Sequence, residues 1–223
     1  MEQPNYPLEP SVAYWAVHAP IMMGLRAAFK TFAPNWRVSG RKNVPVRGGV
    51  LFAPNHLSDC DPLLVGLSLH RPAWFMAKSE LFDIAVLGPM MRFAQAFPVE
   101  RDSADRAALR RGEQLLKNRQ ALVIFPEGRL SKTGELQPLL PGITMLAMRA
   151  QVPIVPVAIA GSSQLMPYGQ LVPRPTLETV HVHFCKPLEL GDLSDLPPRA
   201  AREESTLRLE KALRAGIEIA SRA

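Results

Sequence analysis

A histidine and two aspartates lie within residues 56–61, directly after the apolar run at residues 49–53. The apolar run predicts a short buried strand. Pro62 opens a second apolar run at residues 63–69, so the pattern predicts a helix with Pro62 at its first position and Asp61 as its N-cap. His56 is therefore expected at the end of a strand, with the Asp61 carboxylate held nearby at the start of a helix.

This arrangement is suited to general-base chemistry. A carboxylate that accepts a hydrogen bond from one imidazole nitrogen fixes the tautomer, and the other nitrogen can then take a proton from a substrate hydroxyl. In open α/β sheets such chemistry lies at the carboxyl ends of strands. The plainer interpretation is that Asp61 only caps a helix, Asp59 lies in a turn and His56 is an ordinary loop residue.

Two further chemistries are less well supported by the same residues. A metal site built from His56, Asp59 and Asp61 would need a second group of ligands, which the sequence lacks, so we expect no metal. Cys60 stands between two acids, which disfavour its thiolate. We therefore expect a buried thiol there and not a nucleophile.

The composition indicates one sizeable domain. The chain has 223 residues, of which 47% are hydrophobic, and this is enough for a substantial core. Its two cysteines lie in different contexts and it has no leader-like start, so we expect neither a disulfide framework nor secretion. The net charge of +6 favours anionic partners, either phosphates, a lipid surface or nucleic acid. Nucleic acid is disfavoured because no basic run alternates with aromatic residues.

Strand and helix patterns alternate along the chain. Strands are predicted at 36–40, 49–53, 73–77, 97–101, 121–125, 152–161 and 180–184. The helices expected between them include one capped by Asp102 and Ser103, one that begins at Pro141, and a last one from about Arg199. The prolines in 152–161 predict a strand near a sheet edge or bulge, and the two histidines of 180–184 are expected to share a polar face and bind nothing. The fold class is α/β, a single layered domain at residues 36–223 with a mainly parallel central sheet flanked by helices.

Residues 1–35 form a separate segment, an arm followed by an apolar helix. The stretch 12–25 has no formal charge but contains Pro20, and it is shorter than the roughly 20 apolar residues of a membrane span. Two interpretations remain open. The segment is either a core helix or an interfacial helix whose Arg26 and Lys30 meet anionic lipid.

Four motifs then occur in a fixed order: Asn55-His56 with Asp61, Phe-Pro-Val-Glu-Arg at 97–101, Phe-Pro-Glu-Gly-Arg at 125–129, and Val-Pro-Ile-Val-Pro-Val at 152–157. Together they resemble the glycerolipid acyltransferase family, that is, the 1-acylglycerol-3-phosphate acyltransferases and related lysophospholipid acyltransferases. The resemblance implies that His56 is the general base and that Asp61 orients it. A lysolipid hydroxyl would attack the thioester of acyl-CoA or acyl carrier protein, a co-substrate, so no cofactor is expected.

The same resemblance implies further binding residues. Arg101 and the turn formed by Glu127, Gly128 and Arg129 would hold the glycerol phosphate of the acceptor, since guanidinium groups offer paired donors. Lys78 matches a family lysine near the site. The apolar segments 79–82 and 86–93 would suit a fatty substrate. The expected location is the cytoplasmic face of a membrane, as a peripheral or monotopic protein on an anionic surface.

The third motif departs from the usual Phe-Pro-Glu-Gly-Thr-Arg. Here Arg129 takes the threonine place and Leu130 the arginine place, a version that looks like the branch acting on lysophosphatidylethanolamine. The expected acceptor is still 1-acylglycerol-3-phosphate, giving phosphatidic acid, because this activity is commoner in the family and the net charge of +6 favours the more anionic substrate. Lysophosphatidylethanolamine is the second possible acceptor, and an amino-acid lipid or a sterol-like alcohol is a third. A non-enzymatic lipid-binding protein of the same fold is the rival from another class, and the intact His56 and Asp61 argue against it.

Overall fold

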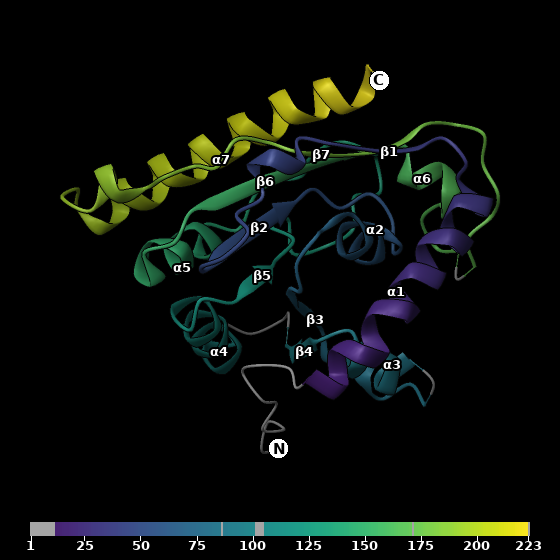
Figure 1. The fold of residues 1–223 in the computed structure, drawn as a ribbon. Coiled ribbons are helices and arrows are strands. Elements are labelled where there is room, and N and C mark those ends of the chain that lie inside the picture. The colour runs from purple at the N-terminus through teal and green to yellow at the C-terminus, as the bar shows by residue number, and fades with distance from the viewer. Residues whose placement is uncertain (1–11, 86, 101–104, 171, 223) are drawn as a thin grey trace.

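The computed structural model describes residues 12–85, 87–100, 105–170 and 172–222. Within them a seven-stranded sheet has the order β1-β7-β6-β2-β5-β3-β4 (Figure 1). The strands are β1 Trp36–Ser39, β2 Val50–Pro54, β3 Trp74–Lys78, β4 Ala96–Val99, β5 Ala121–Val123, β6 Ile154–Ala160 and β7 Val180–Phe184. All neighbouring strands are parallel except β6 and β7. The predicted α/β class with a mainly parallel sheet is confirmed.

Helices cover both faces of this sheet (Figure 1). The α-helices are α1 Val12–Phe32, α2 Asp61–Ser68, α3 Leu87–Phe93, α4 Arg106–Lys117, α5 Gly142–Ala150, α6 Ser162–Leu165 and α7 Pro198–Ser221, and the 3₁₀ turns are η1 Arg41–Asn43, η2 Ser79–Phe82 and η3 Gly191–Leu193. Val50 and Phe52 of β2 pack toward α1 and α2, whereas Leu51 and Ala53 pack toward α4, α5 and α7. All residues of β2 are buried, as expected for a strand covered on both faces.

The central position of β2 determines where the chemistry lies. Its neighbours β5 and β6 both run parallel to it, so the carboxyl ends of all three strands meet at one edge of the sheet. The loops after β5 and β6 therefore flank the loop after β2, although they follow it by about 70 and about 105 residues in sequence.

The surroundings of β6 and the cap of α4 were both predicted from the sequence, and only the cap was wrong. The strand β6 was expected near an edge or a bulge, and it lies between β7 and β2 with a one-residue shift of register beside Pro156, since Val157 pairs with Phe184 and Ile154 with Leu188. It tolerates Pro156 because the pairing with β7 runs from Val157 to Ala160, and Pro156 still accepts a hydrogen bond from the Cys185 N–H through its carbonyl. The cap of α4 is Asp105, whose carboxylate accepts from Ala107 and Ala108 at 3.0 and 2.9 Å. The cap predicted at 102–103 lies outside the described residues.

The two histidines of β7 are also not on a polar face, because α7 covers them. His181 Nδ1 lies 3.1 Å from the carbonyl oxygen of Ala220 in α7 and must donate to it. The Nε2 of His181 and the Nδ1 of His183 are each 2.7 Å from the Ser39 hydroxyl oxygen. The Ser39 hydroxyl therefore donates to His181 and accepts from His183. This chain of hydrogen bonds joins β1, β7 and α7, and it needs a neutral His181, because the Nε2 of that ring accepts from Ser39.

The stability of the protein should consequently fall in mild acid. Burial lowers the pKa of His181 and His183, and for His183 the neighbouring His181 adds to the effect. The histidines of the unfolded chain take up protons below a pH of about 6.5, whereas those of the folded protein do so only at lower pH. The contribution of each ring to the free energy of unfolding is therefore complete above that pH and is lost as the pH falls toward the lowered pKa. The free energy of unfolding, measured by urea titration at several pH values between neutral and about 5, should fall with decreasing pH. This dependence on pH should be weaker in a His181→Gln, His183→Gln double variant. An equal pH dependence of stability in the wild-type protein and the double variant would show that these two histidines are not responsible for it.

The second half of α1 packs against the domain. Phe29 is buried in the core, and the Arg26 guanidinium donates to the carbonyls of Leu67 and Leu69 at 2.8 Å each. These carbonyls lie at the carboxyl end of α2, where a helix lacks internal donors and favours a cation. Among the described helices none qualifies as a membrane span.

Candidate active site

His56 and Asp61 form the hydrogen-bonded pair that the sequence predicts. His56 Nδ1 lies 3.0 Å from Asp61 Oδ2, and Asp61 is fully buried. The same carboxylate oxygen accepts from the N–H groups of Leu57 and Ser58 at 2.6 and 2.8 Å. A carboxylate oxygen only accepts, so Nδ1 carries the hydrogen. His56 Nε2 has no hydrogen-bond partner within the described residues and is the nitrogen left to take a proton.

Asp61 does not cap its own helix. The helix α2 begins at Asp61 itself, Cys60 is the N-cap residue and Pro62 occupies the second position. The Asp61 side chain turns back to the loop that contains His56. The interpretation of Asp61 as a simple helix cap is therefore wrong, and the predicted helix start was late by one residue. The Oδ2 atom of Asp61 accepts from both the loop backbone at residues 57–58 and the His56 imidazole, and so it fixes their relative positions.

The backbone of His56 is clamped by the loop that follows β5. Its N–H donates to Glu127 Oε1 at 2.7 Å, and its carbonyl accepts from the Ser131 N–H at 2.8 Å. The ring of Phe125 packs on the imidazole, with centroids 4.1 Å apart. On the other side, the Asn55 side chain exchanges two hydrogen bonds with the backbone of Ile159 in β6, at 2.7 and 3.0 Å. The segment after β5 therefore holds His56 directly, and β6 holds the preceding residue, Asn55.

Glu127 positions this loop and does not face a substrate. It is 3% exposed, and its second oxygen accepts from the Gln137 N–H at 2.8 Å. Burial raises the pKa of Glu127, and the N–H groups of Gln137 and His56 oppose that rise. The predicted role of Glu127 in holding the acceptor phosphate does not fit this geometry, because neither carboxylate oxygen is available. Sequence reasoning missed the contact with His56, since the only signal was an acid in a tight turn after a buried strand.

The remaining predicted binding residues differ in their surroundings. Gly128 has φ of 67°, and a Cβ there would lie 2.6 Å from Leu140 Cδ1, so the turn requires glycine. Arg129 is exposed, and the described structure gives its side chain no ion pair. Lys78 ends β3 and pairs with the exposed Glu80 at 2.8 Å. Arg101 lies outside the described residues.

The cysteine and serine beside the pair are poorly placed for covalent catalysis. Burial, reinforced by the charge of Asp61, raises the pKa of the Cys60 thiol to about 12. The buried Ser58 hydroxyl donates to the Met166 carbonyl at 2.7 Å. The expectation of an inert thiol at Cys60 agrees with this environment. No cluster of three or more metal-binding side chains occurs within the described ranges.

Known proteins resemble the part of the chain that contains this site. Residues 35–160 match the family model described as Acyltransferase. A 1-acyl-sn-glycerol-3-phosphate acyltransferase of Bacillus subtilis is 27% identical over 180 residues, which cover 80% of this chain and 83% of that protein. A chloroplastic enzyme of the same name from Brassica napus is 32% identical over 135 residues, 59% of this chain. The chain spans only 39% of that plant protein.

A solved structure has the same fold. The crystal structure of the 1-acyl-sn-glycerophosphate acyltransferase PlsC from Thermotoga maritima superposes with a TM-score of 0.71 at 25% sequence identity. The match covers 92% of this chain and 81% of that one.

Proposed function

This chain belongs to the acyltransferase family, and on that premise we propose that it moves a fatty acyl group from an acyl thioester to the free hydroxyl of 1-acylglycerol-3-phosphate, giving phosphatidic acid. The observation that carries the proposal is the His56–Asp61 pair at the carboxyl end of β2, with Nδ1 bonded to the carboxylate and Nε2 left without a protein partner in the described structure. The names of the relatives and of the Thermotoga structure support the acceptor.

In this mechanism the acceptor hydroxyl gives its proton to His56 Nε2 while its oxygen attacks the thioester carbonyl. The resulting imidazolium lies 3.0 Å from the Asp61 oxygen, which favours the positive charge in the transition state. The tetrahedral intermediate then collapses, the C–S bond breaks, and the departing sulfur takes the proton from Nε2. The thioester already supplies a reactive carbonyl and a good leaving group. No covalent enzyme intermediate and no cofactor are needed, and acyl-CoA or acyl carrier protein serves as the donor.

The acceptor phosphate is proposed to bind Arg101 and Arg129. Arg129 follows the glycine of the turn whose Glu127 accepts from the His56 N–H, so its backbone lies at the same edge of the sheet as the base. Lysophosphatidylethanolamine is the second candidate acceptor, because the arginine of the usual motif is displaced by one position here, with Leu130 in the arginine place and Arg129 in the threonine place.

A competition experiment distinguishes the two acceptors. The purified protein is given one acyl thioester with equal amounts of lysophosphatidic acid and lysophosphatidylethanolamine in mixed micelles, and the products are measured by mass spectrometry. We expect phosphatidic acid to predominate and Arg129→Ala to raise the KM for the acceptor by about tenfold. A preference for lysophosphatidylethanolamine would overturn the proposed acceptor, and an unchanged KM would remove Arg129 from the phosphate site.

We also propose that α1 rests on an anionic membrane surface at the cytoplasmic face. The helix exposes the apolar side chain of Met23 to 67% and those of Ile21 and Leu25 to 41% and 40% in the described structure. Beside it lies a hollow of about 440 Å³ that is lined by the cationic residues Lys30 and Arg41, among others. Apolar side chains next to cations suit the headgroup region of anionic lipid.

The membrane proposal predicts a change in vesicle binding. Met23→Ser with Ile21→Ser should weaken binding to vesicles that contain phosphatidylglycerol by roughly tenfold, because about 1 kcal/mol or more of apolar transfer energy is lost. Leu207→Ser with Ile219→Ser on α7, which also removes exposed apolar side chains, is the matched control. Equal losses in both variants, or no loss in either, would contradict the assignment to α1.

A further inference from the structure

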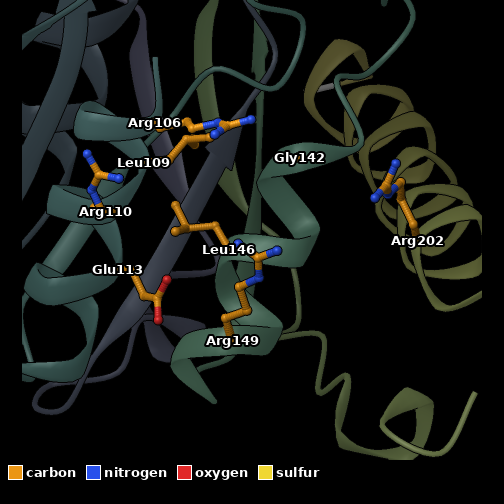
Figure 2. Close-up of a pocket in the computed structure, with 8 residues that line it drawn as sticks. All are labelled: Arg106, Leu109, Arg110, Glu113, Gly142, Leu146, Arg149 and Arg202. Atoms are coloured by element: carbon orange, nitrogen blue, oxygen red, sulfur yellow. The ribbon is translucent and has the colours of Figure 1, made fainter. Parts of the chain in front are cut away.

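A groove lined by arginines lies between α4 and α5 and is bordered by α7 (Figure 2). Its volume is about 520 Å³. Four arginines line it, Arg106 and Arg110 from α4, Arg149 from α5 and Arg202 from α7. This surface, called the arginine groove below, is not part of the His56 site.

The four arginines are unusual because acids do not neutralise them. In the part of the chain that the structure describes, none of the four forms an ion pair, although other arginines of α7 do. The acid in the lining, Glu113, is bonded to Lys117 at 2.6 Å. The described lining of the arginine groove thus contains four arginines and one acid, which already pairs with Lys117, so the surface is strongly positive and an anionic partner would complete it.

The shape and floor of the groove indicate what kind of anion it takes. Leu109 and Leu146 lie in it, so an apolar floor is flanked by basic walls. A helix with acidic side chains beside an apolar stripe has the complementary surface. No aromatic residue is among the described residues that line the groove, so it offers no platform on which an adenine base could stack. This pattern favours an acidic protein helix over a nucleotide.

One end of the arginine groove lies near the edge of the sheet that carries His56. The helix α4 follows β4, and α5 follows the loop after β5, so both helices start at the edge of the sheet where His56 lies. Leu140, just before α5, donates to the Pro126 carbonyl at 2.7 Å and so ties the helix start to the turn of Glu127. Figure 2 shows Arg106 and Gly142 at the same end of the groove. That end opens toward the active-site edge.

We propose that the arginine groove docks the acidic helical surface of an acyl carrier protein that delivers the thioester to His56. This inference rests on the proposed acyl transfer and names its donor. Docking there places the carrier beside the catalytic edge, and its flexible prosthetic arm spans the remaining distance.

The test compares two donors that carry the same acyl chain, one on acyl carrier protein and one on CoA. In Arg110→Gln/Arg149→Gln, kcat/KM for the carrier-protein donor should fall roughly tenfold or more, while that for the CoA donor changes less than about twofold. The control is Arg47→Gln/Lys186→Gln, which removes the same charge from exposed positions away from the groove and should leave both values unchanged. Equal loss with both donors would assign the groove to phosphate groups and overturn the protein-docking proposal, as would no loss with either.

A binding measurement separates this proposal from the proposed function. Fluorescence anisotropy of labelled acyl carrier protein should show binding to the wild-type protein that weakens with salt and is reduced about tenfold in the groove variant. If the wild-type protein transfers from neither donor but binds the carrier in this way, the proposed function fails and the docking site stands. Absence of groove-dependent binding overturns the docking site, even when acyl transfer is intact.

Discussion

The His56→Ala variant should transfer acyl groups at least 10² to about 10⁴ times more slowly than the wild-type protein while keeping its fold. The loss is expected because the acceptor hydroxyl then has no base at the carboxyl end of β2. The fold should survive because Asp61 keeps the N–H groups of Leu57 and Ser58 as partners after the imidazole is removed. The measurement is initial-rate thiol release from an acyl thioester in the presence of lysophosphatidic acid, with circular dichroism to check folding.

The matched control for this prediction is His70→Ala. His70 is exposed and follows α2, so its removal should leave the rate within about twofold. A folded His56→Ala protein that releases thiol at close to the wild-type rate would show that the imidazole is not the base.

The Glu127→Gln variant should also lose most of its activity, although this side chain does not face the substrate. The carboxylate accepts from two backbone N–H groups, of His56 and Gln137, whereas an amide has one accepting oxygen and one NH₂ group. One N–H would therefore face another donor. We expect a loss of about 1–3 kcal/mol in the free energy of unfolding and roughly a 10- to 100-fold lower kcat, with little change in the KM for the acceptor.

The control for Glu127→Gln is Glu135→Gln on the same loop, because Glu135 is exposed. It should change neither stability nor kcat. An increase in the KM for lysophosphatidic acid without a fall in kcat would show instead that Glu127 contacts the acceptor. That result would return Glu127 to the phosphate-binding role that the family resemblance implies.

The local part of the site was predictable because its signals are short-range. The apolar run 49–53 predicts the strand, and Pro62 predicts the helix, so the sequence places His56 and Asp61 at their junction. The sequence does not show which way the Asp61 side chain turns. A cap position and a contact with the preceding loop give the same residue pattern, and only the packed loop of residues 56–58 distinguishes them.

The parts that could not be predicted depend on contacts between distant segments. Glu127 meets His56 only because β5 pairs with β2, and sequence patterns do not specify the order of strands in a sheet. The prolines of β6 predicted an edge or a bulge, and only the pairing with β7 shows that the strand is interior with a shift of register beside Pro156. Similarly, Arg110 and Arg149 look like ordinary solvent-exposed charges until the packing of α4 against α5 brings them to one groove.

The most direct test of the account is a single-turnover experiment that follows the protein mass and thiol release together. An excess of wild-type protein is mixed with an acyl thioester, first without and then with lysophosphatidic acid. Direct attack by the acceptor, with His56 as base, predicts no mass increase and no thiol release until lysophosphatidic acid is added, and then one thiol for each phosphatidic acid formed. An acylated protein, or a burst of thiol before the acceptor is present, would contradict it.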